Sequence, residues 1–245
     1  MKMLAMGIKR KSNFRNVNRD DIIRKTTNYN EQTIETRVIF MKRKNILFVI
    51  ILLIILCVAA TFFTFLRFRG SKVIRVSKEA MNIIPCENIV LFRQDDERWA
   101  EDKLGSSDYS MQKSGCLVTC IAAALSMSGE TVTPESLNEL FSSGGVYDSE
   151  GNLQWENLRQ LDGGNTFDAE VYTAVSEEIL QDCLEQGKFP IARVRMSRIG
   201  NFHYALIVKL EDGIYFCMDP LADELQPLSH YGSRVYAIRC VSVKD

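Results

Sequence analysis

One cysteine and one histidine are the residues of this sequence best suited to carry out chemistry. Cys116 follows Gly115 at the predicted start of an apolar helix, where unpaired N–H groups and the helix dipole stabilise a thiolate. Of the two histidines in the chain, His203 stands at the predicted start of a strand, whereas His230 is interpreted as a loop residue. A histidine at the start of a strand can face the N-terminus of a helix across a cleft. A thiol and an imidazole so placed are the minimum for nucleophilic cysteine catalysis.

A carboxylate follows at a position suited to hold the imidazole. Asp219 ends the next predicted strand, directly before Pro220, and could fix the tautomer of His203 as the third member of a catalytic triad. The alternative interpretations are a turn residue for Asp219 and a small buried core residue for Cys116. The presence of His203 favours the nucleophile interpretation of Cys116.

The other cysteines are interpreted as structural. Cys120, one helical turn after Cys116, could be a metal ligand or a resolving thiol, but a core position is favoured. A zinc site built from Cys116, Cys120 and His203 would lack tight spacing and a fourth ligand, so we expect no metal and no cofactor. The chain has seven cysteines at irregular spacings, which does not imply a disulfide framework and leaves pairing open.

The elements that must position these residues are predicted as helices first and strands second. Capping residues and apolar runs predict helices over residues 116–127, 133–144, 155–161 and 176–187. Apolar alternation predicts strands over residues 88–92, 189–195, 203–210, 214–218 and 234–243, the last three as a meander. This order indicates an α+β domain with N-terminal helices and a C-terminal antiparallel sheet.

The turn between the second and third C-terminal strands decides whether His203 and Asp219 can meet. A two-residue loop at 212–213 would place the two side chains on opposite faces of the sheet, because side chains alternate along a strand. A three-residue loop at 211–213 would make Asp219 the diagonal neighbour of His203 on one face. The triad interpretation therefore predicts the longer loop, a bulged hairpin and a positive φ at Gly213.

Charge and hydropathy divide the chain into unlike parts. Residues 1–45 hold 12 Lys and Arg against 4 Asp and Glu, a net charge of +8, and form a basic tail. Residues 46–66 are 21 residues without a charge, long enough for a single transmembrane helix. A polar stalk over 67–86 and a domain over 87–245 follow. Residues 67–245 hold 18 Lys and Arg against 27 Asp and Glu, a net charge of −9, which argues against nucleic acid as a partner.

The flanks of the predicted span indicate its orientation and the start of the protein. Basic residues lie on both sides, but the short basic tail favours a cytoplasmic N-terminus and an extracytoplasmic domain at the cell membrane. The sequence MKRKN at 41–45 is typical of the start of a bacterial signal anchor, so Met41 is a candidate initiator. No small-residue cleavage site follows the span, which favours an uncleaved anchor over a signal peptide.

Several short motifs resemble one known family. They are QDDERW at 94–99, LG at 104–105, SGCLVTCIA at 114–122, TP at 133–134, Tyr147, Trp155, HY at 203–204 and DP at 219–220. Together they resemble the C39-like cysteine peptidases, relatives of the double-glycine leader peptidases, over residues 88–220. The resemblance implies a papain-like fold with Cys116 as nucleophile, His203 as base and Asp219 as orienting carboxylate. It also implies that the side-chain amide of Gln94 helps to form an oxyanion hole with the backbone N–H of Cys116.

The resemblance and the predicted span together indicate a membrane-anchored cysteine peptidase or amide hydrolase. Its expected substrate is a peptide or the peptide stem of the cell wall, peptidoglycan, on the outer side of the membrane. The chain has one predicted span and no P-loop, so export-coupled leader cleavage is not implied. Two alternatives stay open: an inactive peptidase-like binding module, and a transglutaminase-like or acyl-transferase enzyme with the same triad.

Overall fold

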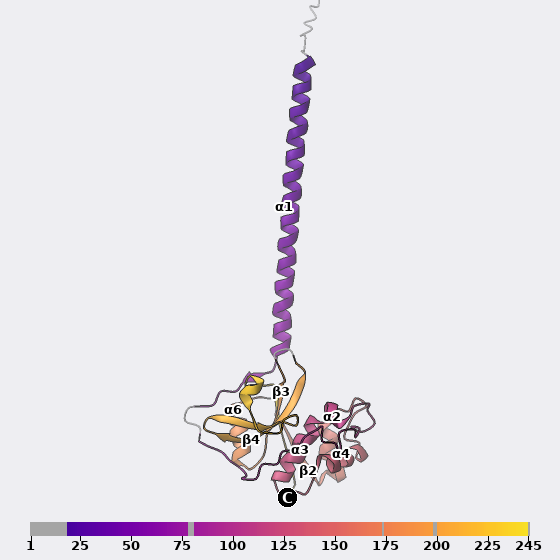
Figure 1. Cartoon of the computed structure of the whole chain (residues 1–245), viewed down its shortest axis with the longest axis vertical. Coiled ribbons are helices and arrows are strands. Elements are labelled where there is room, and N and C mark those ends of the chain that lie inside the picture. The colour runs from indigo at the N-terminus through magenta and orange to yellow at the C-terminus, as the bar shows by residue number, and fades with distance from the viewer. Residues whose placement is uncertain (1–18, 78–80, 173, 198–199, 245) are drawn as a thin grey trace, which may run out of the picture. The chain divides into compact units, whose positions relative to one another are not determined.

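The computed structural model describes residues 19–77, 81–172, 174–197 and 200–244 (Figure 1). The chain divides into two compact units, Met1–Phe68 and Arg69–Asp245. The first 18 residues of the expected basic tail lie outside the described part.

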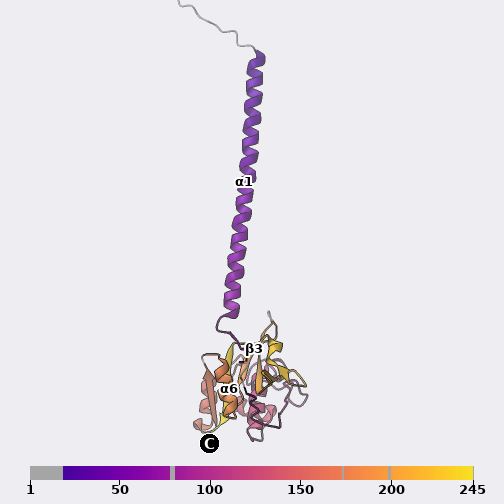
Figure 2. The same ribbon diagram turned by 90° about the vertical axis from the view of Figure 1, so that its left-hand side faces the viewer.

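The described part of the first unit is one continuous helix, α1 (Arg19–Phe68), of 50 residues (Figure 2). It contains the predicted span and also covers residues 19–45, for which no regular structure was expected. Every residue from 46 to 66 is exposed. An exposed apolar surface of this length is unfavourable in water, so other apolar groups must cover it. From Thr27 to Phe68 the helix is long and apolar enough to cross a membrane, although a signal sequence passes the same test.

The second unit has five α-helices in its described part, of which α2 was not predicted. They are α2 (Met111–Ser114), α3 (Cys116–Met127), α4 (Pro134–Ser143), α5 (Trp155–Gln160) and, after one strand, α6 (Glu177–Glu185). Thr133 caps α4 by accepting a hydrogen bond from the N–H of Ser136. Ser176 caps α6 by accepting one from the N–H of Ile179. Two short 3-10 helices, η1 (Leu161–Gly164) and η2 (Leu228–Tyr231), complete the helical part described.

The strands form a six-stranded antiparallel sheet in the order β2-β8-β3-β4-β5-β6. They are β2 (Phe167–Tyr172), β3 (Ile191–Arg195), β4 (Phe202–Glu211), β5 (Ile214–Met218), β6 (Gln226–Pro227) and β8 (Ala237–Val243). A separate two-stranded sheet pairs β1 (Lys72–Val73) with β7 (Arg234–Val235). The unit is a mixed helix and sheet domain, in agreement with the predicted class.

The strand pattern differs from the prediction in several respects. Residues 88–92 form no strand, and β2 was not predicted. The expected meander is wrong, because β8 pairs with β2 and β3 and not with β5. The predicted last strand is interrupted at Tyr236, whose N–H donates to the carbonyl of Arg193 at 2.8 Å. This break lets β7 and β8 join different sheets.

The segment expected as a stalk belongs to the folded unit. β1 pairs with β7, and Ile74, directly after β1, is 4% exposed. Ile83 exchanges backbone hydrogen bonds with Leu210 of β4, at 2.8 and 2.9 Å. The basic residues of this segment alternate with apolar ones that pack inward, so an overall polar composition does not describe it. The compact unit therefore begins at Arg69, not at residue 87.

Helix α3 lies at the centre of the hydrophobic core. Each residue from Val118 to Leu125 is at most 3% exposed, which fits a helix that is apolar all round. It contacts β4 and β8, where Leu206, Ile207 and Ile238 are also fully buried. This packing fixes the N-terminus of α3 relative to the sheet.

Candidate active site

Cys116 is the first residue of α3, and Gly115 separates it from the short helix α2. The N–H of Gly115 donates to the carbonyl of Met111 at 2.7 Å. A Cβ on residue 115 would lie 2.5 Å from that oxygen, so a larger residue would push the backbone apart. The N–H of Cys116 has no acceptor within its own helix, because the first N–H groups of any helix have none. Cys116 begins a helix, as the sequence predicted, and the structure shows it half-buried.

The imidazole of His203 and the carboxylate of Asp219 form a buried pair. His203 is the second residue of β4, and Asp219 directly follows β5; they are 4% and 3% exposed. Nε2 of His203 lies 2.6 Å from Oδ1 of Asp219. Since Asp219 engages Nε2, Nδ1 is the nitrogen left to exchange a proton with a thiol. A carboxylate in this position holds the imidazole in one tautomer and one orientation.

The turn of the β4–β5 hairpin differs from the prediction. Glu211 pairs with Ile214, so the loop has two residues, Asp212 and Gly213, and the predicted three-residue loop is wrong. Both loop residues have a positive φ, 50° and 74°, as in a type I′ turn. The positive φ predicted for Gly213 is thereby confirmed. A type I′ turn matches the right-handed twist of the strands, which favours it over the longer loop.

A bulge further along β4 supplies the change of register that the turn does not. The pairing shifts between Ile207 and Lys209, so that Val208 is the extra residue on its strand. On the side of the bulge away from the turn, β4 and β5 pair in the register that the three-residue loop would have given. One extra residue moves a side chain to the other face of a sheet. As a result, Asp219 lies on the same side as His203 instead of pointing away.

Asp219 receives two further hydrogen bonds. The N–H of Leu221 donates to its Oδ1 at 2.9 Å, and the hydroxyl of Tyr231 donates to its Oδ2. Tyr231 ends η2 and is 6% exposed. Sequence analysis did not identify this tyrosine, because no motif links it to the other site residues. Its only local signal is Gly232, which ends η2 with a positive φ of 70°.

Burial and hydrogen bonding act in opposite directions on the two titratable groups. Burial lowers the pKa of His203, but hydrogen bonds to Asp219 and Cys116 outweigh it and raise the value to about 9. Burial raises the pKa of Asp219, but its hydrogen bonds to His203 and Tyr231 bring it below the usual 3.8. At neutral pH the imidazole is therefore protonated and the carboxylate ionised.

The side chain of Gln94 reaches the start of α3. It is 3% exposed, and its Nε2 donates to the carbonyl of Gln112 at 2.7 Å. In an uninterrupted helix that carbonyl would accept the N–H of Cys116, four residues later. The amide of Gln94 therefore lies beside the backbone of Cys116. Gln112 uses one hydrogen of Nε2, and a second remains.

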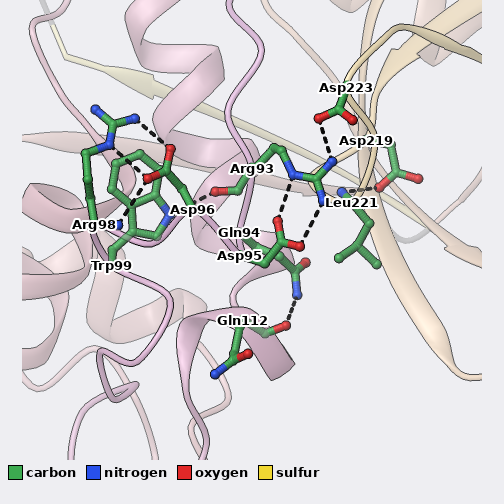
Figure 3. Close-up of polar contacts among 10 residues, drawn as sticks. All are labelled: Arg93, Gln94, Asp95, Asp96, Arg98, Trp99, Gln112, Asp219, Leu221 and Asp223. Atoms are coloured by element: carbon green, nitrogen blue, oxygen red, sulfur yellow. Dashed lines mark hydrogen bonds and ion pairs between the residues drawn. The ribbon is translucent and has the colours of Figure 1, made fainter.

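A polar cluster holds this glutamine segment against the loop after β5 (Figure 3). The N–H of Gln94 donates to the carbonyl of Pro220 at 2.9 Å, and Arg93 pairs with Asp223 at 2.7 Å. Trp99 is 1% exposed and donates its Nε1 to the carbonyl of Arg93 at 2.8 Å. Because Asp223 is largely exposed, its ion pair contributes at most about 1 kcal/mol. The backbone bond and the buried tryptophan are thus the main supports, and sequence analysis missed Arg93 and Asp223.

Cys116 opens into a cleft of about 390 Å³. Its walls combine polar groups with aromatic and aliphatic side chains, and they include Leu104, Tyr109, Leu117, Tyr147, Glu150, Leu153, Trp155 and Tyr204. Tyr147 and Trp155 line this cleft, whereas Trp99 is a core residue. The volume and composition are those of a site for a small molecule or a short stretch of peptide.

Two other residues weighed in the sequence lie outside this cleft. Cys120 is fully buried and donates to the carbonyl of Tyr204 at 3.5 Å, as a core thiol does. His230 is exposed on η2. Within the described residues, no three His, Cys, Asp or Glu side chains gather as a metal ion would require.

Comparison with known proteins gives a distant resemblance among solved structures. No protein-family model matches the chain. No curated protein matches it either. Among solved structures, a proposed C39-like peptidase from Bacillus anthracis is similar with a TM-score of 0.42 and 15% identity, over 66% of this chain and 98% of that chain. A resemblance this distant says nothing about what the chain does.

Proposed function

We propose that this chain is a membrane-anchored cysteine peptidase or amide hydrolase with Cys116 as nucleophile and His203 as general base. The observation that carries the proposal is the buried His203–Asp219 pair, next to a cysteine that begins a helix and opens into a cleft. A thiol, an imidazole and a carboxylate in this order are the groups that acyl transfer by cysteine requires.

The proposed reaction proceeds through a thioester. The thiol of Cys116 gives its proton to Nδ1 of His203, which forms a thiolate–imidazolium pair. Sγ of Cys116 then bonds to the carbonyl carbon of the scissile amide, and the carbonyl π electrons move to the oxygen. His203, protonated at Nδ1, gives that proton to the leaving nitrogen as the C–N bond breaks. A water molecule then attacks the thioester, His203 takes its proton, and the C–S bond breaks to release the acid. Asp219 keeps Nε2 engaged throughout and stabilises the imidazolium.

Two donors support a proposed oxyanion hole for the negative oxygen of the intermediate. One is the backbone N–H of Cys116, which has no acceptor within α3. The other is the second Nε2 hydrogen of Gln94, beside that backbone. We assign both to an oxyanion hole. Donors fixed in advance stabilise the charge that develops, and the loss of one such donor typically costs about 10²–10³-fold in rate.

Basic side chains next to the cleft favour an acidic peptide as substrate. Arg193 lies opposite Tyr204 in the β3–β4 ladder, and the guanidinium of Arg239 lies 5.6 Å from the ring centre of Trp155. Tyr204 and Trp155 both line the cleft. Among the described residues, no carboxylate forms an ion pair with either arginine. The two arginines outnumber Glu150, the carboxylate among the residues that line the cleft, and this local positive charge suits a carboxylate-bearing peptide such as a cell-wall stem.

The location of the activity follows from the first unit. We propose that α1 anchors the chain as a single-pass helix at the cell membrane, with residues 69–245 on the extracytoplasmic side. The exposed apolar residues 46–66 and the basic residues before them support this orientation.

The direct test uses the full-length chain in detergent with a mixture of peptides and purified cell-wall fragments, followed by mass spectrometry. We expect new amine and carboxylate ends that are absent with Cys116→Ala. An added amine separates hydrolysis from acyl transfer, because a transferase would attach it to the new carbonyl. If wild type and Cys116→Ala gave the same products, and a thiol-directed electrophile did not label Cys116, the chain would be a binding module instead.

A further inference from the structure

Two cysteines outside the candidate active site have their sulfur atoms in contact. Cys183 lies on α6 and Cys240 on β8, 57 positions apart in the sequence. Their Sγ atoms are 2.9 Å apart, and each residue is 2% exposed. A disulfide has a sulfur–sulfur distance of about 2.05 Å, so a movement of less than about 1 Å would bring the two atoms to bonding distance.

Other thiols of the domain make a different kind of contact. Cys120 donates to the carbonyl of Tyr204 at 3.5 Å, and Cys86 donates to the carbonyl of Asn88 at 3.0 Å. Only weak hydrogen bonds are available to a thiol, so a carbonyl oxygen is a sufficient partner for a cysteine that serves only as a core residue. The contact between the sulfur atoms of Cys183 on α6 and Cys240 on β8 differs from these contacts with carbonyl oxygens.

A polar network adjoins the two thiols. The hydroxyl of Tyr172 lies 3.5 Å from Sγ of Cys183 and donates to Glu170, which also accepts from the ammonium of Lys188. Glu170 is the partner of Cys240 in the β2–β8 ladder. A hydrogen bond from Cys240 lowers the pKa of Cys183 against the effect of burial, whereas the pKa of Cys240 is raised. Cys183 is therefore the better nucleophile of the two.

We propose that Cys183 and Cys240 are a site of oxidative modification and form a disulfide on exposure to an organic disulfide as oxidant. The thiolate of Cys183 attacks one sulfur of the oxidant, which forms a mixed disulfide and releases one thiolate. Cys240 loses its proton and attacks the sulfur of Cys183, which closes the protein disulfide and releases the second thiolate. The two cysteines lose two electrons and two protons, and the oxidant is reduced to two thiols.

The cross-link would enclose the part of the chain that carries the candidate base. The segment between the two cysteines includes β3, β4, β5 and η2, and therefore His203, Asp219 and Tyr231. A disulfide stabilises chiefly by restricting the unfolded chain, and a loop of this length gives a large effect. An extracytoplasmic domain would benefit, because disulfides persist in oxidising compartments.

The test uses the purified full-length chain in detergent, reduced and then incubated with oxidised glutathione. Remaining thiols are alkylated under denaturing conditions, and the protein is digested and analysed by mass spectrometry. We expect a linked peptide pair containing Cys183 and Cys240 that disappears on reduction. The oxidised chain should also unfold about 10 °C above the reduced chain. Full alkylation of both cysteines after oxidation, or their linkage to other cysteines, would overturn the proposal.

Matched variants separate the cross-link from a general effect of the oxidant. Cys183→Ala and Cys240→Ala should each abolish the difference in unfolding temperature between oxidised and reduced protein. Cys86→Ser should keep both the linked peptide and the temperature difference, because Cys86 contacts a backbone carbonyl instead. A persisting difference in either alanine variant would contradict the assignment. The test does not depend on hydrolase activity, so its outcome is independent of the proposed function.

Discussion

His203 meets Asp219 at 2.6 Å because β4 carries one extra residue between the turn and the histidine. A regular two-residue hairpin would have placed the carboxylate on the opposite face. The bulge at Val208 restores the alignment inside the strand, while the turn stays of the favourable type I′ form. Bulges next to active sites commonly redirect a side chain in this way.

The first prediction concerns the nucleophile. Cys116→Ala and His203→Ala should each lower peptide hydrolysis by at least about 10⁴-fold, because the bond-forming atom or its proton carrier is lost. Cys120→Ala is the control: it removes a buried thiol one turn along α3 and should keep most of the activity. Circular dichroism would show that all variants fold. An essential Cys120 together with a dispensable Cys116 would contradict the assignment.

The second prediction concerns the groups that hold the imidazole. Asp219→Asn should lower kcat, by up to about 10⁴-fold, because an amide carries no negative charge to stabilise the imidazolium. It should also move the alkaline limb of the kcat/KM profile from about pH 9 towards 6.5, the ordinary pKa of histidine. Tyr231→Phe removes one donor to the same carboxylate, which leaves the carboxylate a stronger acceptor for the imidazolium, so the limb should move slightly in the alkaline direction. A limb that Asp219→Asn did not move would show that the pair does not control His203.

The sequence predicts those features of the site that depend on residues close together in the chain, and it misses those that depend on distant residues. The caps of α4 and α6 and the start of α3 at Cys116 depend on residues next to one another, and the sequence predicted them. The bulge at Val208 depends on the balance between turn geometry and the pairing of two whole strands, which no local pattern shows. Tyr231 reaches Asp219 from a part of the chain that carries no motif.

The same reason explains the errors in the fold. The segment 67–86 has a basic composition, but single apolar residues such as Ile74 and Ile83 find partners far along the chain. Likewise, the position of β8 between β2 and β3 depends on long-range pairing that begins at Tyr236. The apolar pattern of a segment predicts that the segment forms a strand. It predicts less well which other strands will pair with it.

The third prediction concerns substrate charge. Arg239→Gln should lower kcat/KM for a peptide with a carboxylate beside the scissile bond by about 10-fold, the equivalent of about 1.4 kcal/mol. Turnover of the matching peptide with an amide at that position should change little. Arg98→Gln is the control, because Arg98 is exposed and pairs with Asp96 in the 93–99 segment. Equal losses for both peptides would mean that Arg239 supports the fold and does not select the substrate.

The fourth prediction concerns topology. Protease added to intact cells should degrade residues 69–245, because a cytoplasmic basic tail places this unit outside. An epitope tag at the N-terminus should remain protected until the cells are lysed, and a cytoplasmic marker protein serves as the control for leakage. Protection of residues 69–245 in intact cells, with digestion only after lysis, would reverse the orientation.

The last prediction is a dependence of stability on pH. Because the pKa of His203 rises from 6.5 to about 9 on folding, protonation of His203 stabilises the folded state. This contribution is fully present below pH 6.5 and is lost as the pH rises through about 9. Its size is up to about 3 kcal/mol, at roughly 1.4 kcal/mol for each pKa unit. Asp219 titrates below 3.8, outside this window.

His203→Gln isolates this effect, because glutamine cannot be protonated in the same range. The difference in unfolding temperature between wild type and His203→Gln should be largest near pH 6 and should shrink by several degrees at pH values above 9, as the linkage requires. Taking the difference between the two proteins removes the pH dependence that comes from groups common to both. One such group is the thiol of Cys183, whose pKa is lowered by its hydrogen bond with Cys240. A difference that stayed constant across this range would mean that folding does not raise the pKa of His203.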